Sequence, residues 1–558
     1  MFIYKYDFSI VMGYYNRKSQ IINTLNMFQQ NYIGYKFEVI IVDDNSSPEH
    51  RLDDLIPLYS FPIKHIVITE DEKGDRINPC ITYNRGIRVA EGKYLIIQNP
   101  ECMHVGNILQ YVENNLTENQ YIAFSCFNVN NRELSDALVE DINLINDRNF
   151  REKNARIMQE WYNHPVYRPV HYHFCAAIYN DNMKMIGGFD ENFANGHSYD
   201  DNEILLSIEK NLKLEIKTIP PESCFVIHQW HSRDAENRFT QEEFNRKLIT
   251  NKTLYYKYVE EHNRYNFNFP KLLHLYWDGS KLSYLNFLTV LSFRQHHFGW
   301  KINIFCPVKR NENISWVTHE QKKQYTGKDY FNRLKELDNV FIHTIDTDIL
   351  PFRYKDASEV IKSDYFRLYV LNRYGGLWSD FDIIYTNNVE QYYKDKELKT
   401  TKNMIIYNYQ SIIKYYPVGL FLANKLNSIL KVILKYIDQF YDPKNYQCLG
   451  CAMFQNIFNY YDKNESLKAI LNEMSLRELL IDHADCYLKI KWNQLDLFYK
   501  STNIEPDTYE NDKTIFGLHW FNGADASKEY CNNLDITQLK KKDSSSLCLI
   551  DKFVKKYI

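Results

Sequence analysis

Residues 8–47, FSIVMGYYNRKSQIINTLNMFQQNYIGYKFEVIIVDDNSS, decide the fold class of the first half of this chain. Two short apolar runs, FSIVMGYY and FEVIIVDD, flank the amphipathic segment KSQIINTLNMFQQ. Further apolar runs of the same kind follow at 63–70 and 92–101. Buried apolar strands separated by helices are typical of a parallel α/β sheet with right-handed crossovers. The first half is therefore predicted to be such a sheet.

Three acidic side chains fall where strands of this predicted sheet end. Asp43 and Asp44 close the run FEVIIVDD, and Glu101 closes GKYLIIQNPE. Ligands of parallel α/β sheets bind beyond the carboxyl ends of the strands. Acids after a strand also cap helices or stabilise turns, which is the alternative interpretation. Their position favours contact with a nucleotide.

The length and composition of the chain indicate two domains. A chain of 67.0 kDa is too long for one hydrophobic core. Residues 232–268 are charged and aromatic without apolar β runs, and are predicted to form a connecting helix and a short linker. An α/β pattern then restarts with PKLLHLYWDG. We expect one α/β domain over 1–265, including the linker helix, and a second over 266–558.

Bulk properties exclude some classes of protein. The formal net charge of −4 does not favour nucleic-acid binding, and no apolar run approaches the length of a membrane span. The opening residues resemble a strand and lack the apolar core and cleavage site of a signal peptide. The 11 cysteines contain a single CxxC motif, Cys448 to Cys451, with no second pair to complete a zinc site. These features predict a reduced, cytoplasmic compartment.

The stretch NRYGGLWSDFDIIY, residues 372–385, carries the main chemical signal of the second half. Asp380 and Asp382 stand on either side of one phenylalanine, before an apolar run. Two such acids at a strand end can share a hard divalent cation, Mn²⁺ or Mg²⁺. A cation held there neutralises a leaving diphosphate. A solvated acidic turn is the alternative.

The longer stretch SDYFRLYVLNRYGGLWSDFDIIY resembles the DxD glycosyltransferases, which include family-32 mannosyltransferase-like enzymes and the clostridial glucosylating toxins. LHLYWDG at 273–279 and GLHWFNG at 517–523 resemble the opening strand and the late histidine-tryptophan element of that group. The resemblance implies roles for seven residues: Trp277 near the base, Asp364 at the ribose or base, Arg367 near the donor sugar or phosphates, Trp378 where the group often has tyrosine, Asp380 at the sugar and ribose, Asp382 as metal ligand, and His519 as a metal or diphosphate contact. His519 could equally be structural.

Residues 7–231 resemble the inverting family-2 glycosyltransferases, which have the nucleotide-sugar-binding α/β fold called GT-A. The quoted runs match in order, followed by NPCITYNRGIRVAEGKYLIIQNPE and GGFDENFANGHSYDDNEILLSI. The resemblance implies that Asp201, after Asp200, is the general base that deprotonates the acceptor. An acid that favours a helix N-terminus is the alternative. Arg76 and Arg85 could pair with diphosphate or form surface salt bridges.

One departure from the family-2 pattern concerns the metal. Asn99-Pro100-Glu101 replaces D-x-D, so Glu101 remains as a ligand and Asn99 offers a neutral amide. Hard cations accept amide oxygen as well as carboxylate, so metal binding is predicted to be weaker here. His228 and His231 follow a strand where related enzymes sometimes place a metal-binding histidine, although a structural use is equally open.

The sequence therefore predicts two tandem GT-A domains in a metal-dependent bifunctional glycosyltransferase. The first is expected to invert and the second to retain configuration, with UDP- or GDP-sugar donors and a glycan or glycoprotein acceptor. Two alternatives remain. The first domain could be a degenerate glycan-binding module, as Asn99 suggests, or the chain could be a glucosylating effector that acts on a protein.

Overall fold

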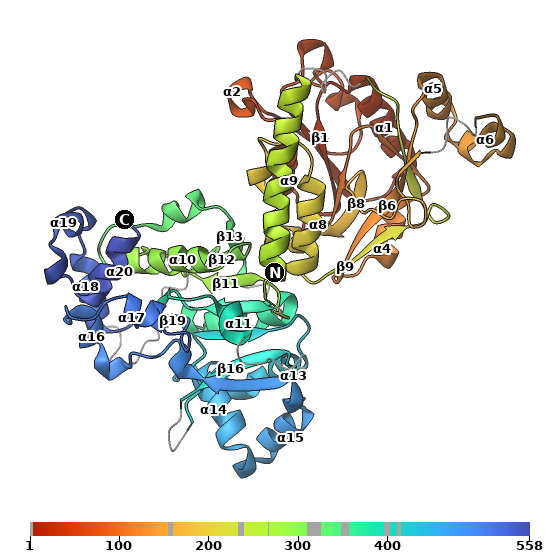
Figure 1. The fold of residues 1–558 in the computed structure, drawn as a ribbon. Coiled ribbons are helices and arrows are strands. Elements are labelled where there is room, and N and C mark those ends of the chain that lie inside the picture. Colours follow the sequence, from red (N-terminus) through yellow and green to blue (C-terminus); the bar gives the residue numbers. More distant parts are fainter. Residues whose placement is uncertain are drawn as a thin grey trace. The chain divides into compact units, whose positions relative to one another are not determined.

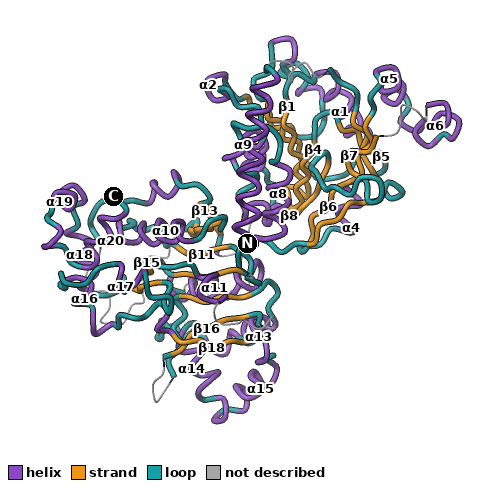
Figure 2. Tube along the Cα trace, in the orientation of Figure 1, coloured by secondary structure: helices purple, strands orange, loops and turns teal. Residues whose placement is uncertain are grey.

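The computed structural model describes residues 4–154, 160–232, 239–265, 267–309, 325–347, 357–394, 402–409 and 414–558. The chain divides into two compact units, Phe2–Glu260 and Glu261–Ile558. Each combines a mixed β-sheet with helices, so the chain is an α/β protein with two mixed sheets (Figures 1 and 2).

The N-terminal unit contains these strands and helices in chain order: β1 (Tyr6–Tyr14), α1 (Lys18–Asn31), β2 (Phe37–Asp43), β3 (Ile63–Val67), α2 (Glu70–Lys73), α3 (Cys80–Val89), β4 (Gly92–Gln98), β5 (Cys102–Val105), α4 (Ile108–Asn115), β6 (Gln120–Asn128), α5 (Arg132–Glu140), α6 (Arg148–Asn154), β7 (Glu160–Asn163), β8 (Cys175–Tyr179), α7 (Asn180–Ile186), α8 (Asp200–Lys210), β9 (Glu215–Ile219), β10 (Phe225–His228) and α9 (Gln241–Asn263). Helix α9 includes most of the predicted connecting helix.

The strand order of this unit is β3-β2-β1-β4-β8-β6-β10-β5, with β7 and β9 also paired to β6. Strands β3, β2, β1 and β4 are parallel, as predicted. The prediction of a wholly parallel sheet was wrong beyond β4, because β8 runs antiparallel to both β4 and β6. Short apolar runs such as β10 have no feature that fixes strand direction, which depends on where the connecting chain crosses the sheet.

Helices pack against the apolar faces of the parallel half of this sheet. Every residue of β2 is buried, as expected for a strand covered on both sides. Helix α3 approaches the sheet at Gly86, where a Cβ would lie 2.5 Å from Val11 Cγ1. Helices α8 and α9 pack through Leu206 and Tyr258. Because β1, β2 and β4 run parallel, their carboxyl ends lie at one edge of the sheet.

The C-terminal unit contains these strands and helices in chain order: β11 (Leu272–Tyr276), α10 (Tyr284–His296), β12 (Lys301–Pro307), β13 (Val340–Ile345), α11 (Glu359–Tyr374), β14 (Gly376–Ser379), β15 (Ile383–Tyr385), α12 (Val389–Lys394), β16 (Met404–Asn408), β17 (Leu420–Ala423), α13 (Ser428–Lys435), α14 (Cys451–Asn459), α15 (Glu465–Glu473), β18 (Leu479–His483), α16 (Asp496–Tyr499), α17 (Asp507–Glu510), β19 (Gly517–His519), α18 (Asp525–Asn533), α19 (Ile536–Lys541) and α20 (Leu549–Lys556).

Its sheet has the order β13-β12-β11-β14-β17-β16-β18. Strand β14 is parallel to β11 and antiparallel to β17. A separate ribbon pairs β15 with β19, and its register sets Ile383 opposite His519. This ribbon brings the residues after the DxD motif next to a segment more than a hundred residues later in the chain.

Candidate active sites

In the N-terminal unit, a pocket of about 270 Å³ lies beyond the ends of β1 and β2. Its lining includes Tyr15, Asp44 and Lys73. The Lys73 Nζ lies 3.4 Å from the Asp44 carboxylate and 3.6 Å from the centre of the Tyr15 ring. Arg76 is buried and pairs with the other carboxylate oxygen of Asp44. The pocket therefore offers an aromatic ring beside a carboxylate and a lysine, with Arg76 buried behind the carboxylate, which suits a nucleoside.

Two residues predicted to contact the nucleotide lie elsewhere. Asp43 is fully buried, and its carboxylate accepts from the Ser46 backbone N–H at 2.7 Å and faces Arg51. Burial opposes ionisation, but hydrogen bonds from His65 and Ser46 hold the Asp43 pKa below its usual value. Arg85 pairs with exposed Glu72 at 2.9 Å. Asp43 thus fixes a turn and Arg85 forms a surface ion pair, the alternative weighed for each.

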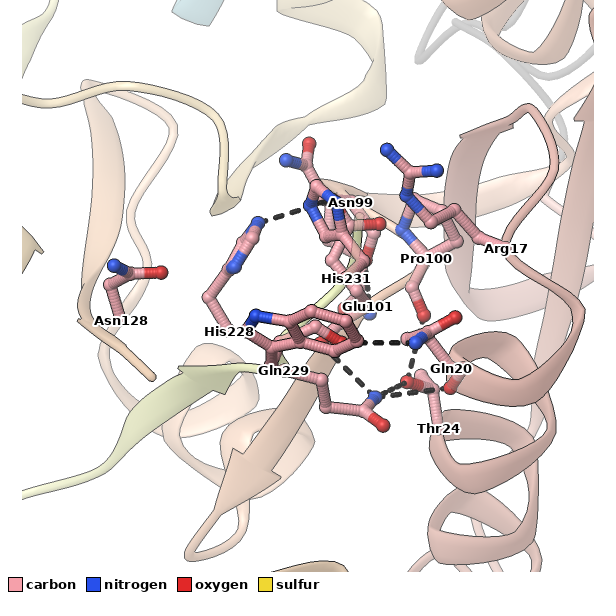
Figure 3. Close-up of polar contacts among 12 residues, drawn as sticks. Arg17, Gln20, Thr24, Asn99, Pro100, Glu101, Asn128, His228, Gln229 and His231 are labelled. Atoms are coloured by element: carbon pink, nitrogen blue, oxygen red, sulfur yellow. Dashed lines mark hydrogen bonds and ion pairs between the residues drawn. The ribbon is translucent and has the colours of Figure 1, made fainter. Parts of the chain in front are cut away.

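A candidate metal centre lies beyond the end of β4. The Glu101 Oε1 lies 3.1 Å from His228 Nε2 and 3.5 Å from His231 Nε2, and one ligand atom from each of the three residues lies within 4.8 Å of the others. Figure 3 shows both histidines beside Glu101, next to Asn99 and Pro100. Burial alone would raise the pKa of Glu101, but hydrogen bonds from His228 and His231 hold it well below the usual range.

The main chain that carries this carboxylate is anchored by two side chains. The Thr24 hydroxyl donates to the Pro100 carbonyl at 2.8 Å, and the Gln229 side chain donates to the Glu101 carbonyl at 3.1 Å (Figure 3). The Nδ1 atom of His228 is buried without a hydrogen-bond partner among the described residues. A fixed carboxylate and two adjacent imidazoles fit a divalent cation with mixed oxygen and nitrogen ligands.

Asn99 turns its amide oxygen towards Tyr83, whose hydroxyl donates to it at 3.0 Å. Its backbone N–H donates to the Phe174 carbonyl at 3.1 Å. The amide oxygen therefore accepts a hydrogen bond from a phenol, whereas the Glu101 carboxylate faces two imidazoles that are themselves candidate metal ligands. Its predicted contact with the nucleotide sugar stays a prediction.

The predicted base, Asp201, lies in the first turn of α8, after a strained turn. Ser198 and Tyr199 have positive φ angles of 58° and 67°, and the Asn251 side chain donates to the Ser198 carbonyl at 2.7 Å. Asp201 has 27% of its side chain exposed, and its Oδ1 accepts hydrogen bonds from both the backbone N–H and the Nδ1 of His173. No residue that the structure describes donates a hydrogen bond to its Oδ2.

Asp200 has a different environment from its neighbour. It is buried at 7% exposure and accepts from Asn78 at 2.9 Å. Burial and the adjacent Asp201 raise the Asp200 pKa. Of the two acids predicted to be catalytic, only Asp201 is open to an acceptor, whereas Asp200 supports the turn.

In the C-terminal unit, a pocket of about 860 Å³ is lined by predicted residues from several elements. They are Trp277, Asp364, Arg367, Asp380, Asp382 and His519. A volume of this size is typical of sites for nucleotide-sized ligands. The structure therefore brings together six of the seven residues that the resemblance singled out in this half.

Arg367 organises one side of this pocket. Its Nη2 lies 2.8 Å from Asp364 Oδ1 and 3.6 Å from Asp380 Oδ1, and its Nη1 donates to the Val418 carbonyl. Burial raises the pKa of Asp364 to about 6, against the opposing effect of Arg367. Two carboxylates around one buried guanidinium leave a fixed, charged surface for polar groups of a ligand.

Asp382 lies at the other side, directly before β15. Its Oδ1 is 3.1 Å from His519 Nε2, and its Oδ2 accepts from the Asn522 backbone N–H at 2.9 Å. Burial lowers the pKa of His519, but the Asp382 carboxylate outweighs it and raises that pKa overall. Lys528 lines the same pocket and donates to the Asn522 side chain. This side combines a carboxylate, an imidazole and an amine.

Two tryptophans next to the DxD motif and His519 are buried and lie outside the pocket lining. Trp378 is fully buried and does not line the pocket; its indole N–H donates to Asp380 Oδ1 at 3.1 Å beneath Arg367. It orients Asp380 and so acts on a ligand only through that carboxylate. Trp520 is also fully buried, and its backbone N–H donates to the Asp382 carbonyl.

Sequence reasoning missed several residues of these sites. Lys73, His173 and Lys528 are isolated in the sequence and belong to none of the motifs. His173 stands in HYHFC, where four ring side chains follow one another and only the fold distinguishes them. The lysines come from α2 and α18, whose approach to each pocket depends on tertiary packing.

Comparison with known families now identifies part of the chain. Residues 9–175 match the family described as "Glycosyl transferase family 2". The N-terminal unit carries a family-2 glycosyltransferase domain. The predicted family resemblance of this half and its enzyme class are thereby confirmed.

The C-terminal unit matches a different family. Residues 320–495 match "Capsular polysaccharide synthesis protein", so this unit carries such a domain, of the family-32-like DxD group. The closer resemblance to clostridial toxins stays a prediction. Among the described residues, no helix is long and apolar enough to cross a membrane.

Comparisons with curated proteins and solved structures do not identify the chain further. No curated protein matches the chain. A solved structure of S. aureus TarS is 16% identical, with a TM-score of 0.30 over 46% of this chain and 40% of TarS. TarS residues 1–349 in complex with UDP-GlcNAc give 15% identity and a TM-score of 0.30, over 46% of this chain and 67% of that one. The chain therefore spans 40% of the length of the first of these structures, and likeness at this level fixes neither fold nor substrate.

Proposed function

We propose that the chain is a bifunctional, metal-dependent glycosyltransferase with two tandem GT-A domains, which bind nucleotide-sugar donors at separate sites. The observation that carries this proposal is the recurrence of one arrangement in each unit. A pocket at strand ends is lined by at least one carboxylate, one cationic side chain and one aromatic ring, and lies in a unit that carries a sugar-transfer or polysaccharide-synthesis domain.

In the N-terminal unit, we assign the transfer step to Asp201. The acceptor hydroxyl oxygen attacks the anomeric carbon from the side opposite the diphosphate and gives its proton to Asp201 Oδ2. The bond between that carbon and the diphosphate oxygen breaks, and its electron pair leaves with the diphosphate. Configuration is inverted because attack and departure take place on opposite faces.

Glu101, His228 and His231 would hold the cation of this unit. A bound Mn²⁺ or Mg²⁺ supplies charge that stabilises the leaving diphosphate. The nucleoside would occupy the pocket of Tyr15 and Asp44, where Lys73 adds positive charge.

In the C-terminal unit, Arg367, His519 and Lys528 place positive charge in the pocket, and Asp380 and Asp382 would hold the cation. We propose retention of configuration here. The departing phosphate then accepts the acceptor proton on the same face, so no protein base is required. UDP- and GDP-sugars are the donors proposed, and a glycan or glycoprotein the acceptor.

A second candidate function rests on Asn99. Because its amide oxygen is occupied by Tyr83, the N-terminal unit could be a degenerate module that binds a glycan without transferring sugar. That module would need no base at Asp201.

Product stereochemistry tests the proposal and separates it from this candidate. The full chain carrying Asp380→Ala and Asp382→Ala is incubated with Mn²⁺ and a panel of UDP- and GDP-sugars, and NMR identifies the first anomer released. We expect the inverted anomer, and Asp201→Asn should lower kcat about 10²–10⁴-fold while the donor KM changes little. Glu209→Gln, at an exposed site on the same helix, is the matched control. No turnover of any donor, or unchanged turnover by Asp201→Asn, would contradict the assignment.

A further inference from the structure

His173 lies between the base and the residues at the end of β4. Its backbone N–H donates to Asp201 Oδ1 at 3.1 Å and its ring Nδ1–H donates to the same atom at 2.5 Å. Two donors from one residue therefore hold one oxygen of a partly exposed carboxylate. The other oxygen carries no hydrogen bond from any described residue.

The imidazole itself has little freedom to move. Tyr83 packs edge-on against it at 4.8 Å between ring centres, and Phe189 packs at 4.9 Å. The side chain is 8% exposed. The rings of Tyr83 and Phe189 keep the Nδ1–H of His173 directed at Asp201, because a buried side chain packed against other rings has few alternative rotamers.

The same contacts connect His173 to the donor side of the site. Tyr83, which packs on the imidazole, donates its hydroxyl proton to Asn99. The next residue, Phe174, accepts a backbone hydrogen bond from Asn99 and packs on the His228 ring at 6.0 Å. The segment of His173 and Phe174 thus links the base with both Asn99 and the candidate metal ligands.

We propose that His173 is a positioning residue, which fixes the Asp201 carboxylate so that Oδ2 alone faces the acceptor hydroxyl. This inference rests on the proposed role of Asp201. The acceptor proton passes to Oδ2 as the new bond to the anomeric carbon forms and the diphosphate departs with its electron pair. His173 keeps its own proton throughout and acts through orientation.

A packing role and a positioning role give opposite results in two variants. His173→Phe keeps a ring between Tyr83 and Phe189 but removes the side-chain donor. His173→Asn loses the ring but keeps an N–H near the place of Nδ1. Both variants retain the backbone donor to Oδ1.

The experiment uses the full chain with Asp380→Ala and Asp382→Ala, Mn²⁺, and the panel donor that is hydrolysed fastest. We expect His173→Phe to lower kcat about 10- to 100-fold with little change in donor KM, because a small displacement of a catalytic group has effects of this size. His173→Asn should retain kcat within about threefold of the parent, in keeping with a retained donor. His171→Phe is the control, since His171 bonds through Nδ1 to Thr218, outside the site.

The outcomes separate this inference from the proposed function. If Asp201→Asn reduces turnover but His173→Phe does not, or if His173→Asn is the more damaging variant, the positioning role is wrong and the base assignment stands. If Asp201→Asn has no effect, the base assignment fails and the role of His173 fails with it. Thermal unfolding of each variant checks that the fold is retained.

Discussion

At the scale of single residues, the two units present different ligand atoms to a cation. The N-terminal cluster combines Glu101 with His228 and His231, whereas the C-terminal pair Asp380 and Asp382 offers carboxylate oxygens. Imidazole suits transition metals better than it suits Mg²⁺, which prefers oxygen ligands. The amide of Asn99, which led to a prediction of weaker metal binding, thus lies near two imidazoles that are further candidate ligands.

Replacement of one imidazole tests this difference. In the full chain with Asp380→Ala and Asp382→Ala, His231→Gln should weaken Mn²⁺ binding at least about tenfold because a nitrogen ligand is lost. Binding is measured by the electron paramagnetic resonance signal of free Mn²⁺. His171→Gln serves as the control. Equal Mn²⁺ affinity in both variants would show that His231 is not a ligand.

At the scale of elements, apolar periodicity predicted most of the strands and helices that carry the sites. The segments that became β1, α1, β2, β3 and β4 were all recognised from their patterns. Strand direction was not, because β8 looks the same in sequence whether it runs parallel or antiparallel to β4. The motifs likewise placed Asp364, Arg367 and Asp382, but not Lys528, whose approach to the pocket depends on how α18 packs.

The close approach of α14 to α11 is another feature that sequence patterns did not show. At Gly450, the residue before α14, a Cβ would lie 2.5 Å from Asp364 Oδ2. Gly450→Ala should therefore displace Asp364 from Arg367. Overpacking of this kind costs about 1–3 kcal/mol.

We expect Gly450→Ala to raise the donor KM of the C-terminal site about tenfold, which corresponds to about 1.4 kcal/mol and lies within that range. The measurement uses the full chain carrying Asp201→Asn, so that the C-terminal site is observed alone. Turnover by the N-terminal site in an otherwise unchanged Gly450→Ala chain is the internal control. A donor KM equal to that of the parent would mean that Asp364 moves aside without cost to the ligand.

At the scale of the whole molecule, two compact units carry two families of domain in one chain. Length and the charged segment before residue 268 were sufficient to predict two α/β domains. The sequence also predicted the mixed identity of the halves, since each has its own motifs. The acceptor, and whether the two sites act in succession, depend on surfaces that no motif describes.

In the proposed function, each unit turns over a nucleotide sugar independently of the other. The most direct measurement compares nucleotide release from the donor panel, with Mn²⁺, by four full-length proteins: the parent, Asp201→Asn, Asp380→Ala with Asp382→Ala, and the triple variant. We predict that the second and third proteins each lose a different subset of donor activities, and that the triple variant loses both. A triple variant as active as the parent, or one single-site change that removes all turnover, would contradict the account.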